Sequence, residues 1–308
     1  MYLLQKRLFR IGKCRFIIPW IFLVCLWSMA FFTAYGENRD WLDIPYANIS
    51  GNQKLDISLP MSGDGPFPVI VSIHGGGFVL GDKRVSLAPA IRGYAVVSVN
   101  YRLSHEAKFP CQIHDIKAAI RWVRANASVY HLNPDRIAAW GESAGGYLAA
   151  LAGTSGDVKE LEDLSLGNPD QSSRVQAVVD WYGPIDFLAE DAQFTQNGIK
   201  IKENQTRNWL ESVLLDKKLS DDPELATVIN PETYITPDDP PFMIQHGTAD
   251  KDVPFQQSVN FAGKLKKTIG KDKVKLELLK AIEHHDPAFF TLNNLNKVLN
   301  FLDKYMKK

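Results

Sequence analysis

The chain has 308 residues, of which 45% are hydrophobic and 11% aromatic. Its 35 basic residues balance 35 acidic ones, so the composition does not favour a polyanionic partner, and nucleic-acid binding is not expected. This length and hydrophobic content are sufficient for one domain with a full buried core.

The N-terminal segment differs from the rest of the chain. Small residues at Ala34 and Gly36 fit the minus-three and minus-one positions of a cleavage site. We therefore expect a signal peptide at residues 1–36 and a secreted or periplasmic protein, with an uncleaved membrane anchor as the alternative. Cleavage would leave Cys111 as the single cysteine, so no internal disulfide could form. An uncharged run over residues 16–36 follows a group of basic residues: Lys6, Arg7, Arg10, Lys13 and Arg15.

Strand and helix patterns alternate through the first half of the remaining chain. Residues 54–59 alternate apolar with polar side chains, as in a half-buried strand, whereas continuous apolar runs indicate strands buried on both faces. The predicted elements are strands at 46–49, 54–59, 69–73 and 95–99 and a helix at 111–126, on which we expect Asp115 to be a surface or cap-contact carboxylate.

The second half continues this alternation. We expect a parallel sheet flanked by helices, in an α/β fold with a small helical cap at about 187–229 and no separate domain within residues 37–308. The alternative for the cap is a set of peripheral helices far from the site. The predicted elements are strands at 175–179, 242–245 and 274–279, a helix at 255–267 and a C-terminal helix that reaches Lys304.

A serine lies at the apex of a predicted strand, turn and helix. The apolar residues 137–140 precede Gly141–Gly145, which reads GESAG, and small helix-forming residues follow. In a G-x-S-x-G elbow, glycines let strand and helix approach closely, and the serine hydroxyl is presented as a nucleophile. The alternative is an ordinary helix N-terminus capped by Ser143.

Three consecutive glycines follow the buried strand at 69–73. Without side chains, their N–H groups could hold a developing oxyanion, and we expect Gly76, Gly77 and Ala144 to supply these donors. The alternative is a flexible turn. We expect the preceding His74 to be structural.

An acid and a histidine follow the serine in the order expected of this architecture. We expect Ser143 to be the nucleophile, Asp250 the acid and His284 the base, because the loops after parallel strands can meet at one sheet edge. Asp252 competes with Asp250, and the spacing alone does not choose between His284 and His285. His246 is interpreted as structural, and Glu142 as a carboxylate that touches the cap or a neighbouring loop.

No cofactor or metal site is expected. Adjacent side chains at His284 and His285 point apart, and no second spaced cluster of ligands accompanies them. The glycines after His74 are not followed by the lysine of a phosphate-binding loop.

From about Asn38 onward the chain resembles a known family, and the segments that carry the resemblance are HGGGFVLGD, NYRLS, FPCQIHDIKAAIRWVRANA, NPDRIAAWGESAGGYLAALAGTSG, VQAVVDWYGPIDF, DDPPFMIQHGTADKDVP and IEHHDPAF. It looks like α/β-hydrolase esterases of the hormone-sensitive-lipase kind, and still more like secreted bacterial acetyl-xylan and feruloyl esterases. The resemblance places the family's nucleophile, acid and base on Ser143, Asp250 and His284. The family's base loop usually reads H-G-G-P, whereas here it reads His284-His285-Asp286-Pro287.

The resemblance implies a serine carboxylesterase. Its expected substrates are short acyl or feruloyl esters, on plant polysaccharide such as xylan, in a shallow and open pocket. The expected partner is a small acyl ester or an acylated polysaccharide, bound as substrate, with a membrane involved only if the N-terminal segment is retained. The alternatives are an amide-cleaving relative, of formamidase or peptidase type, and a non-catalytic binding protein on a hydrolase fold.

Overall fold

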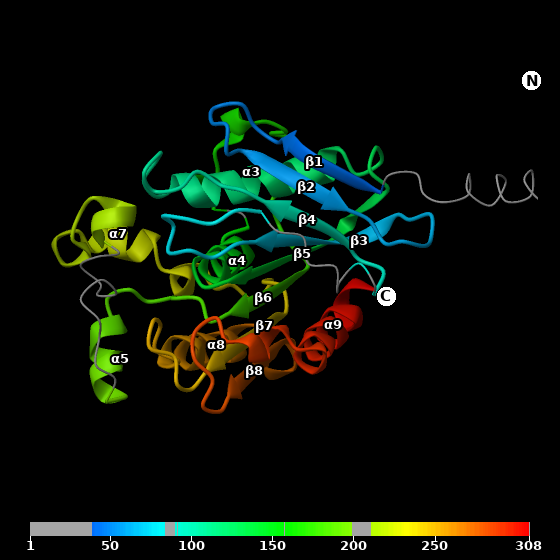
Figure 1. The fold of residues 1–308 in the computed structure, drawn as a ribbon. Helices are drawn as coiled ribbons and strands as arrows, with labels where there is room; N and C mark the ends of the chain where they lie inside the picture. The colour runs from blue at the N-terminus through cyan, green and yellow to red at the C-terminus, as the bar shows by residue number, and fades with distance from the viewer. Residues whose placement is uncertain (1–38, 84–89, 91, 157, 199–210, 308) are drawn as a thin grey trace, which may run out of the picture. The chain divides into compact units, whose positions relative to one another are not determined.

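The computed structural model describes residues 39–307 apart from 84–89, 91, 157 and 199–210 (Figure 1). The expected signal peptide at 1–36 therefore lies outside the described residues, as does the 199–210 part of the expected cap. None of the described helices combines the length and the apolar character needed to span a membrane.

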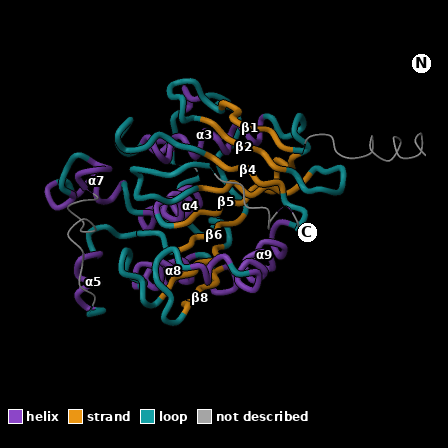
Figure 2. The backbone as a smooth tube through the Cα atoms, in the orientation of Figure 1, coloured by secondary structure: helices purple, strands orange, loops and turns teal. Residues whose placement is uncertain are grey.

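The described strands form one eight-stranded sheet in the order β1-β2-β4-β3-β5-β6-β7-β8 (Figures 1 and 2). β2 pairs antiparallel with both β1 and β4, and every other neighbouring pair is parallel. The strands are β1 (Asp40–Pro45), β2 (Lys54–Ser58), β3 (Phe67–Ile73), β4 (Ala95–Val99), β5 (Leu132–Glu142), β6 (Ala177–Trp181), β7 (Phe242–Gly247) and β8 (Val274–Leu279).

Helices cover both faces of this sheet, so its apolar strands are buried on both sides. In β3, Val69 and Val71 belong to a core shared with α3, α4 and α8, whereas Ile70 belongs to a second core shared with α9. The predicted α/β fold with a mostly parallel sheet is confirmed. The helices are α3 (Cys111–Ala125), α4 (Ala144–Thr154), α5 (Glu190–Gln196), α7 (Pro223–Val228), α8 (Gln256–Thr268) and α9 (Leu292–Met306).

Short helical turns occupy several connections. They are η1 (Lys159–Leu161), η2 (Leu164–Leu166), the π-helical η4 (Glu211–Leu215), η5 (Leu219–Asp221), η6 (Pro231–Tyr234), η7 (Lys271–Lys273) and η8 (Pro287–Phe290).

The first predicted strand, at 46–49, is wrong. The strand lies earlier, at β1, and the chain then turns back toward β2. The buried Gln53 side chain holds this turn, because its Oε1 accepts the N–H groups of Ile49 at 2.9 Å and Ser50 at 3.0 Å. A side chain that satisfies backbone donors in this way competes with strand pairing.

The expectation that Asp115 is a surface or cap-contact carboxylate is also wrong. Asp115 is fully buried, and its two oxygens accept the backbone N–H of Arg102 at 2.8 Å and the guanidinium Nη2 of Arg102 at 2.7 Å. Gln53 Nε2 donates to the same carboxylate at 2.8 Å. The helical periodicity of α3 could not reveal this pair, because Arg102 lies on the loop after β4.

Asp115→Ala is expected to lower the free energy of unfolding by about 3–5 kcal/mol, because it leaves the charge of Arg102 buried without its partner. Urea unfolding followed by circular dichroism measures this loss. Asp170→Ala, at an exposed position, is the matched control and is expected to change stability by less than about 0.5 kcal/mol. Equal midpoints for the two variants would contradict the account.

The insertion expected as a cap has helical structure in its described parts, 187–198 and 211–229. Its second part packs against the face that carries α3 and α4, where Tyr147 Oη donates to the carbonyl of Ile229 at 2.7 Å. Phe109 N also donates to the carbonyl of Leu214 at 3.1 Å. These contacts place the segment beside the helix that follows Ser143, and its role as a cap stays a prediction.

Candidate active site

Ser143 occupies a strained turn between β5 and α4. Its φ of 54° and ψ of −121° are rarely adopted by residues with a side chain, and the Ser143 side chain makes no capping hydrogen bond to the helix. An ordinary capped helix N-terminus is therefore the wrong interpretation. A Cβ at Gly141 would lie 2.0 Å from the carbonyl oxygen of Gly145, and one at Gly145 would lie 2.1 Å from that of Ile73. Both positions therefore require glycine.

The structure brings His284 between Ser143 and Asp250. Its Nδ1 lies 2.7 Å from Asp250 Oδ2, and its Nε2 lies 2.9 Å from Ser143 Oγ. An ionised carboxylate only accepts hydrogen bonds, so Nδ1 carries the proton and donates it to Asp250. Nε2 is then free to accept the hydrogen bond that the Ser143 hydroxyl donates, which is the arrangement a general base requires.

Asp250 is held as a buried anion. Its Oδ1 accepts the backbone N–H groups of Asp252 at 2.8 Å and Val253 at 2.9 Å, and His246 Nε2 lies 3.2 Å from Oδ2. Burial alone would raise the pKa of Asp250, but hydrogen bonds from His246 and His284 outweigh it and hold the pKa well below its usual value. The carboxylate therefore stays ionised at neutral pH.

Asp252 and His285, the alternative candidates for the acid and the base, make other contacts. Asp252 contributes its backbone N–H to Asp250, and it is Asp250 that contacts His284. The His285 ring turns toward Glu142 instead, with Nδ1 3.1 Å from Glu142 Oε2.

His246 contacts the acid directly, a role that the sequence interpretation missed. The side chain is fully buried, and its Nδ1 lies 2.7 Å from Ser258 Oγ on α8 while its Nε2 faces Asp250. It therefore contacts the same carboxylate oxygen, Asp250 Oδ2, that His284 Nδ1 contacts. The available signal was a histidine four residues before the acid, at the end of a buried strand.

The glycine loop after β3 lies against the serine turn. A Cβ at Gly75 would come within 2.9 Å of the carbonyl oxygen of Glu142, and Gly76 and Gly77 have φ values of 104° and 59°. Among the described residues, the N–H groups of Gly76, Gly77 and Ala144 donate to no backbone carbonyl outside the helices and strands. The role of these N–H groups as oxyanion donors, expected from the sequence, stays a prediction.

His74 supports this loop. Its ring stacks on Tyr101 with centroids 4.5 Å apart, and its Nδ1 lies 2.8 Å from the carbonyl oxygen of Gly75. These contacts suit the structural role expected from the sequence.

A comparison with protein-family profiles finds a match to this chain. The BD-FAE family profile covers residues 55–265, more than half of the chain. The chain belongs to the BD-FAE family. The expected relationship to α/β-hydrolase esterases is thereby confirmed.

Relatives of this BD-FAE protein include curated esterases and solved structures. The chain is 32% identical over 251 residues to the probable carboxylic ester hydrolase LipM of Mycobacterium tuberculosis, an alignment that covers 77% of this chain and 54% of LipM. The chain spans about half the length of the first curated relatives that it matches.

Two solved structures share both fold and sequence with it. A truncated carbohydrate esterase from gut microbiota aligns with a TM-score of 0.77 at 32% identity and covers 87% of this chain and 96% of its own. A bifunctional GH43-CE protein of Bacteroides eggerthii aligns with a TM-score of 0.74 at 34% identity, over 86% of this chain and 38% of its own.

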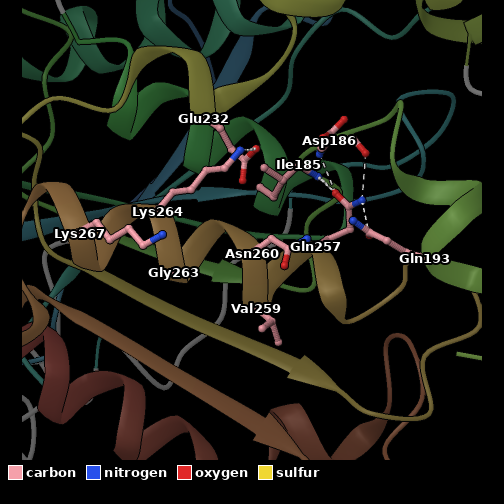
Figure 3. A pocket seen from close by; sticks show the side chains of 10 residues that line it. All are labelled: Ile185, Asp186, Gln193, Glu232, Gln257, Val259, Asn260, Gly263, Lys264 and Lys267. Atoms are coloured by element: carbon pink, nitrogen blue, oxygen red, sulfur yellow. Dashed lines mark hydrogen bonds and ion pairs between the residues drawn. The ribbon is translucent and has the colours of Figure 1, made fainter. Parts of the chain in front are cut away.

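A cleft of about 320 Å³ lies along α8, and its lining residues do not include the serine, the acid or the histidine (Figure 3). Gln257 joins the surrounding elements there. Its Oε1 accepts the N–H groups of Ile185 at 2.7 Å and Asp186 at 2.6 Å, and its Nε2 donates to Gln193 Oε1 at 2.7 Å. The cleft is thus a junction between α8, α5 and the loop after β6. Its lining residues are Ile185, Asp186, Gln193, Glu232, Gln257, Val259, Asn260, Gly263, Lys264 and Lys267.

Within the described residues, no group of three or more His, Cys, Asp or Glu side chains could hold a metal ion. The chemistry proposed below uses side chains and backbone amides alone.

Proposed function

We propose that this BD-FAE protein is a carboxylic ester hydrolase that works through a Ser143–His284–Asp250 triad. The observation that carries the proposal is the unbroken chain of hydrogen bonds from Ser143 Oγ through His284 to a buried, ionised Asp250. A serine hydroxyl is a weak nucleophile at neutral pH, and an adjacent neutral imidazole activates it.

Acylation begins when Ser143 Oγ attacks the ester carbonyl carbon. His284 Nε2 takes the hydroxyl proton, and the charge of Asp250 stabilises the imidazolium that forms. The carbonyl oxygen becomes an oxyanion, which accepts hydrogen bonds from the N–H groups of Gly76, Gly77 and Ala144. One such donor typically contributes about 2.7–4 kcal/mol of transition-state stabilisation. The leaving alcohol takes the proton from His284 and departs, which leaves an acyl ester on Ser143.

Deacylation uses the same groups with water. His284 Nε2 removes a proton from a water molecule, which attacks the acyl carbon, and Ser143 leaves as its hydroxyl with the proton returned by His284. The carboxylic acid product is released and the starting state is restored.

We propose short acyl or feruloyl esters of plant polysaccharide, such as xylan, as the substrates. The support is the likeness to a structure named as a carbohydrate esterase and to one named as a GH43-CE protein. Acetate, butyrate and octanoate esters of nitrophenol should be hydrolysed at rates that fall with chain length, and acetate or ferulate should be released from native xylan. The nitroanilide of acetate is the control, expected to react more slowly than the ester. A preference for octanoate, or for the amide, would overturn this proposal.

We also propose that residues 1–36 direct export and are then removed, since basic residues precede an uncharged run with a small-residue cleavage site. Mass spectrometry of the protein recovered outside the cytoplasm should find Glu37 at its N-terminus. Recovery of the intact N-terminus in a membrane fraction would favour the anchor instead.

A further inference from the structure

A second cluster of side chains borders the serine and the histidine. Glu142 immediately precedes Ser143, and its Oε2 accepts a hydrogen bond from Tyr182 Oη at 2.9 Å and lies 3.1 Å from His285 Nδ1. Tyr182 Oη lies 3.5 Å from the same His285 nitrogen. We call Glu142, Tyr182 and His285 the bridging cluster, because it joins the serine turn to the loop that carries His284.

Tyr182 connects this cluster to the base itself. Its ring is fully buried and packs edge to face against the His284 ring, with centroids 4.6 Å apart. Burial, followed by the neighbouring Glu142 carboxylate, raises the pKa of Tyr182, so its hydroxyl stays protonated and donates to Glu142. One residue therefore contacts both the base and the carboxylate beside the nucleophile.

The backbone of the cluster is strained. His285 has a φ of 53° and Tyr182 a φ of 45°, in the left-handed region that residues with large side chains seldom adopt. Such conformations persist only where the surrounding contacts hold them. Glycine would satisfy the backbone at position 285, so the imidazole is carried there at a conformational cost.

A backbone hydrogen bond also connects the loop that carries His284, called here the base loop, to the loop that carries Asp250. Ala249 N donates to the carbonyl oxygen of Ile282 at 3.0 Å, which ties the base loop to the loop of Asp250. The contact between His285 and Glu142 adds a tie on the serine side. The His285 side chain is 63% exposed, so this contact adds little to global stability and its effect should be on local geometry.

We propose that His285 is a positioning residue that, through Glu142, holds the base loop against the serine turn and so sets the distance between Ser143 and His284. This inference rests on the proposed triad chemistry. The bridging cluster acts through His284 and takes no part in proton transfer.

His285→Gly is the decisive variant, because glycine fits the left-handed backbone and removes only the imidazole. We expect kcat for nitrophenyl acetate to fall about tenfold, since small misplacements of catalytic groups slow the chemical step. KM should stay within about twofold of the wild-type value, because the substitution removes no contact that binds the substrate and the transition state equally. Thermal unfolding should occur at the wild-type temperature or above. The rate at which a fluorophosphonate labels Ser143 should fall with kcat.

His285→Asn is the variant expected to restore the kcat that His285→Gly loses. The asparagine amide can place a donor near the position of Nδ1, and asparagine tolerates the left-handed region. This variant should recover most of the lost kcat. In a Glu142→Gln background, His285→Gly should cost less than it does alone, because the two residues act through one contact.

The outcomes separate the two proposals. Unchanged kcat in His285→Gly, or a loss that His285→Asn does not recover, would overturn the positioning role. If Ser143→Ala retains activity, the proposed function itself fails. If Ser143→Ala is inactive while His285→Gly behaves as wild type, the inference about His285 alone is overturned.

Discussion

Ser143→Ala is expected to lower kcat for nitrophenyl acetate by about a millionfold, because the residues of such a triad act as a unit and removing the nucleophile abolishes their joint effect. Without Oγ there is no acyl-enzyme, and His284 Nε2 loses the proton donor that it contacts at 2.9 Å. Steady-state hydrolysis measures the loss, and labelling by a fluorophosphonate should disappear with it.

The unfolding temperature of Ser143→Ala distinguishes a loss of catalysis from a loss of folding. Alanine keeps the strained φ of 54°, so Ser143→Ala should unfold at the wild-type temperature, whereas Ser143→Gly should be equally inactive but more stable. Ser220→Ala, at an exposed position, is the matched control and should retain full activity. Substantial hydrolysis by Ser143→Ala, with label on another residue, would contradict the assignment of the nucleophile.

The sequence could predict the parts of the site that depend on short, local residue patterns. The apolar run 137–140, the GESAG turn and the small residues after it each follow from short-range geometry, and the structure places Ser143 between β5 and α4. The order of Ser143, Asp250 and His284 could be interpreted because parallel strands end at one sheet edge. The strands predicted at 95–99 and 274–279 are confirmed at the bounds of β4 and β8.

The missed features depend on contacts between distant loops. Nothing near Asp115 in the sequence marks Arg102 as its partner, and nothing near Glu142 marks His285. The strand predicted at 46–49 failed because the Gln53 side chain binds two backbone N–H groups that a strand would have paired. Periodicity reports which face of an element is buried, whereas these contacts depend on where loops meet in the folded chain.

Asp250→Asn is expected to lower kcat by about 10⁴-fold while leaving the fold intact. The amide is uncharged, so it cannot stabilise the imidazolium of His284 as the carboxylate does. Its NH₂ group can also donate to Nδ1, which would move the imidazole proton to Nε2 and block acceptance of the Ser143 proton. Steady-state hydrolysis of nitrophenyl acetate measures the loss, with Asp252→Asn as the matched control. The control keeps the backbone N–H that Asp250 Oδ1 accepts, so its kcat should stay within about twofold of wild type.

The same variant has a pH signature in stability. The pKa of Asp250 is lower in the folded protein than in the unfolded chain, so the ionised carboxylate stabilises the fold at pH values above the unfolded pKa of about 3.9. That contribution is lost as pH falls below about 4 toward the folded pKa, and Asp250→Asn never has it. Thermal unfolding temperatures of wild type and Asp250→Asn should therefore differ most near neutral pH and converge in acid. A constant difference across this range, or a larger loss of kcat in Asp252→Asn, would show that Asp250 is not the ionised partner of His284.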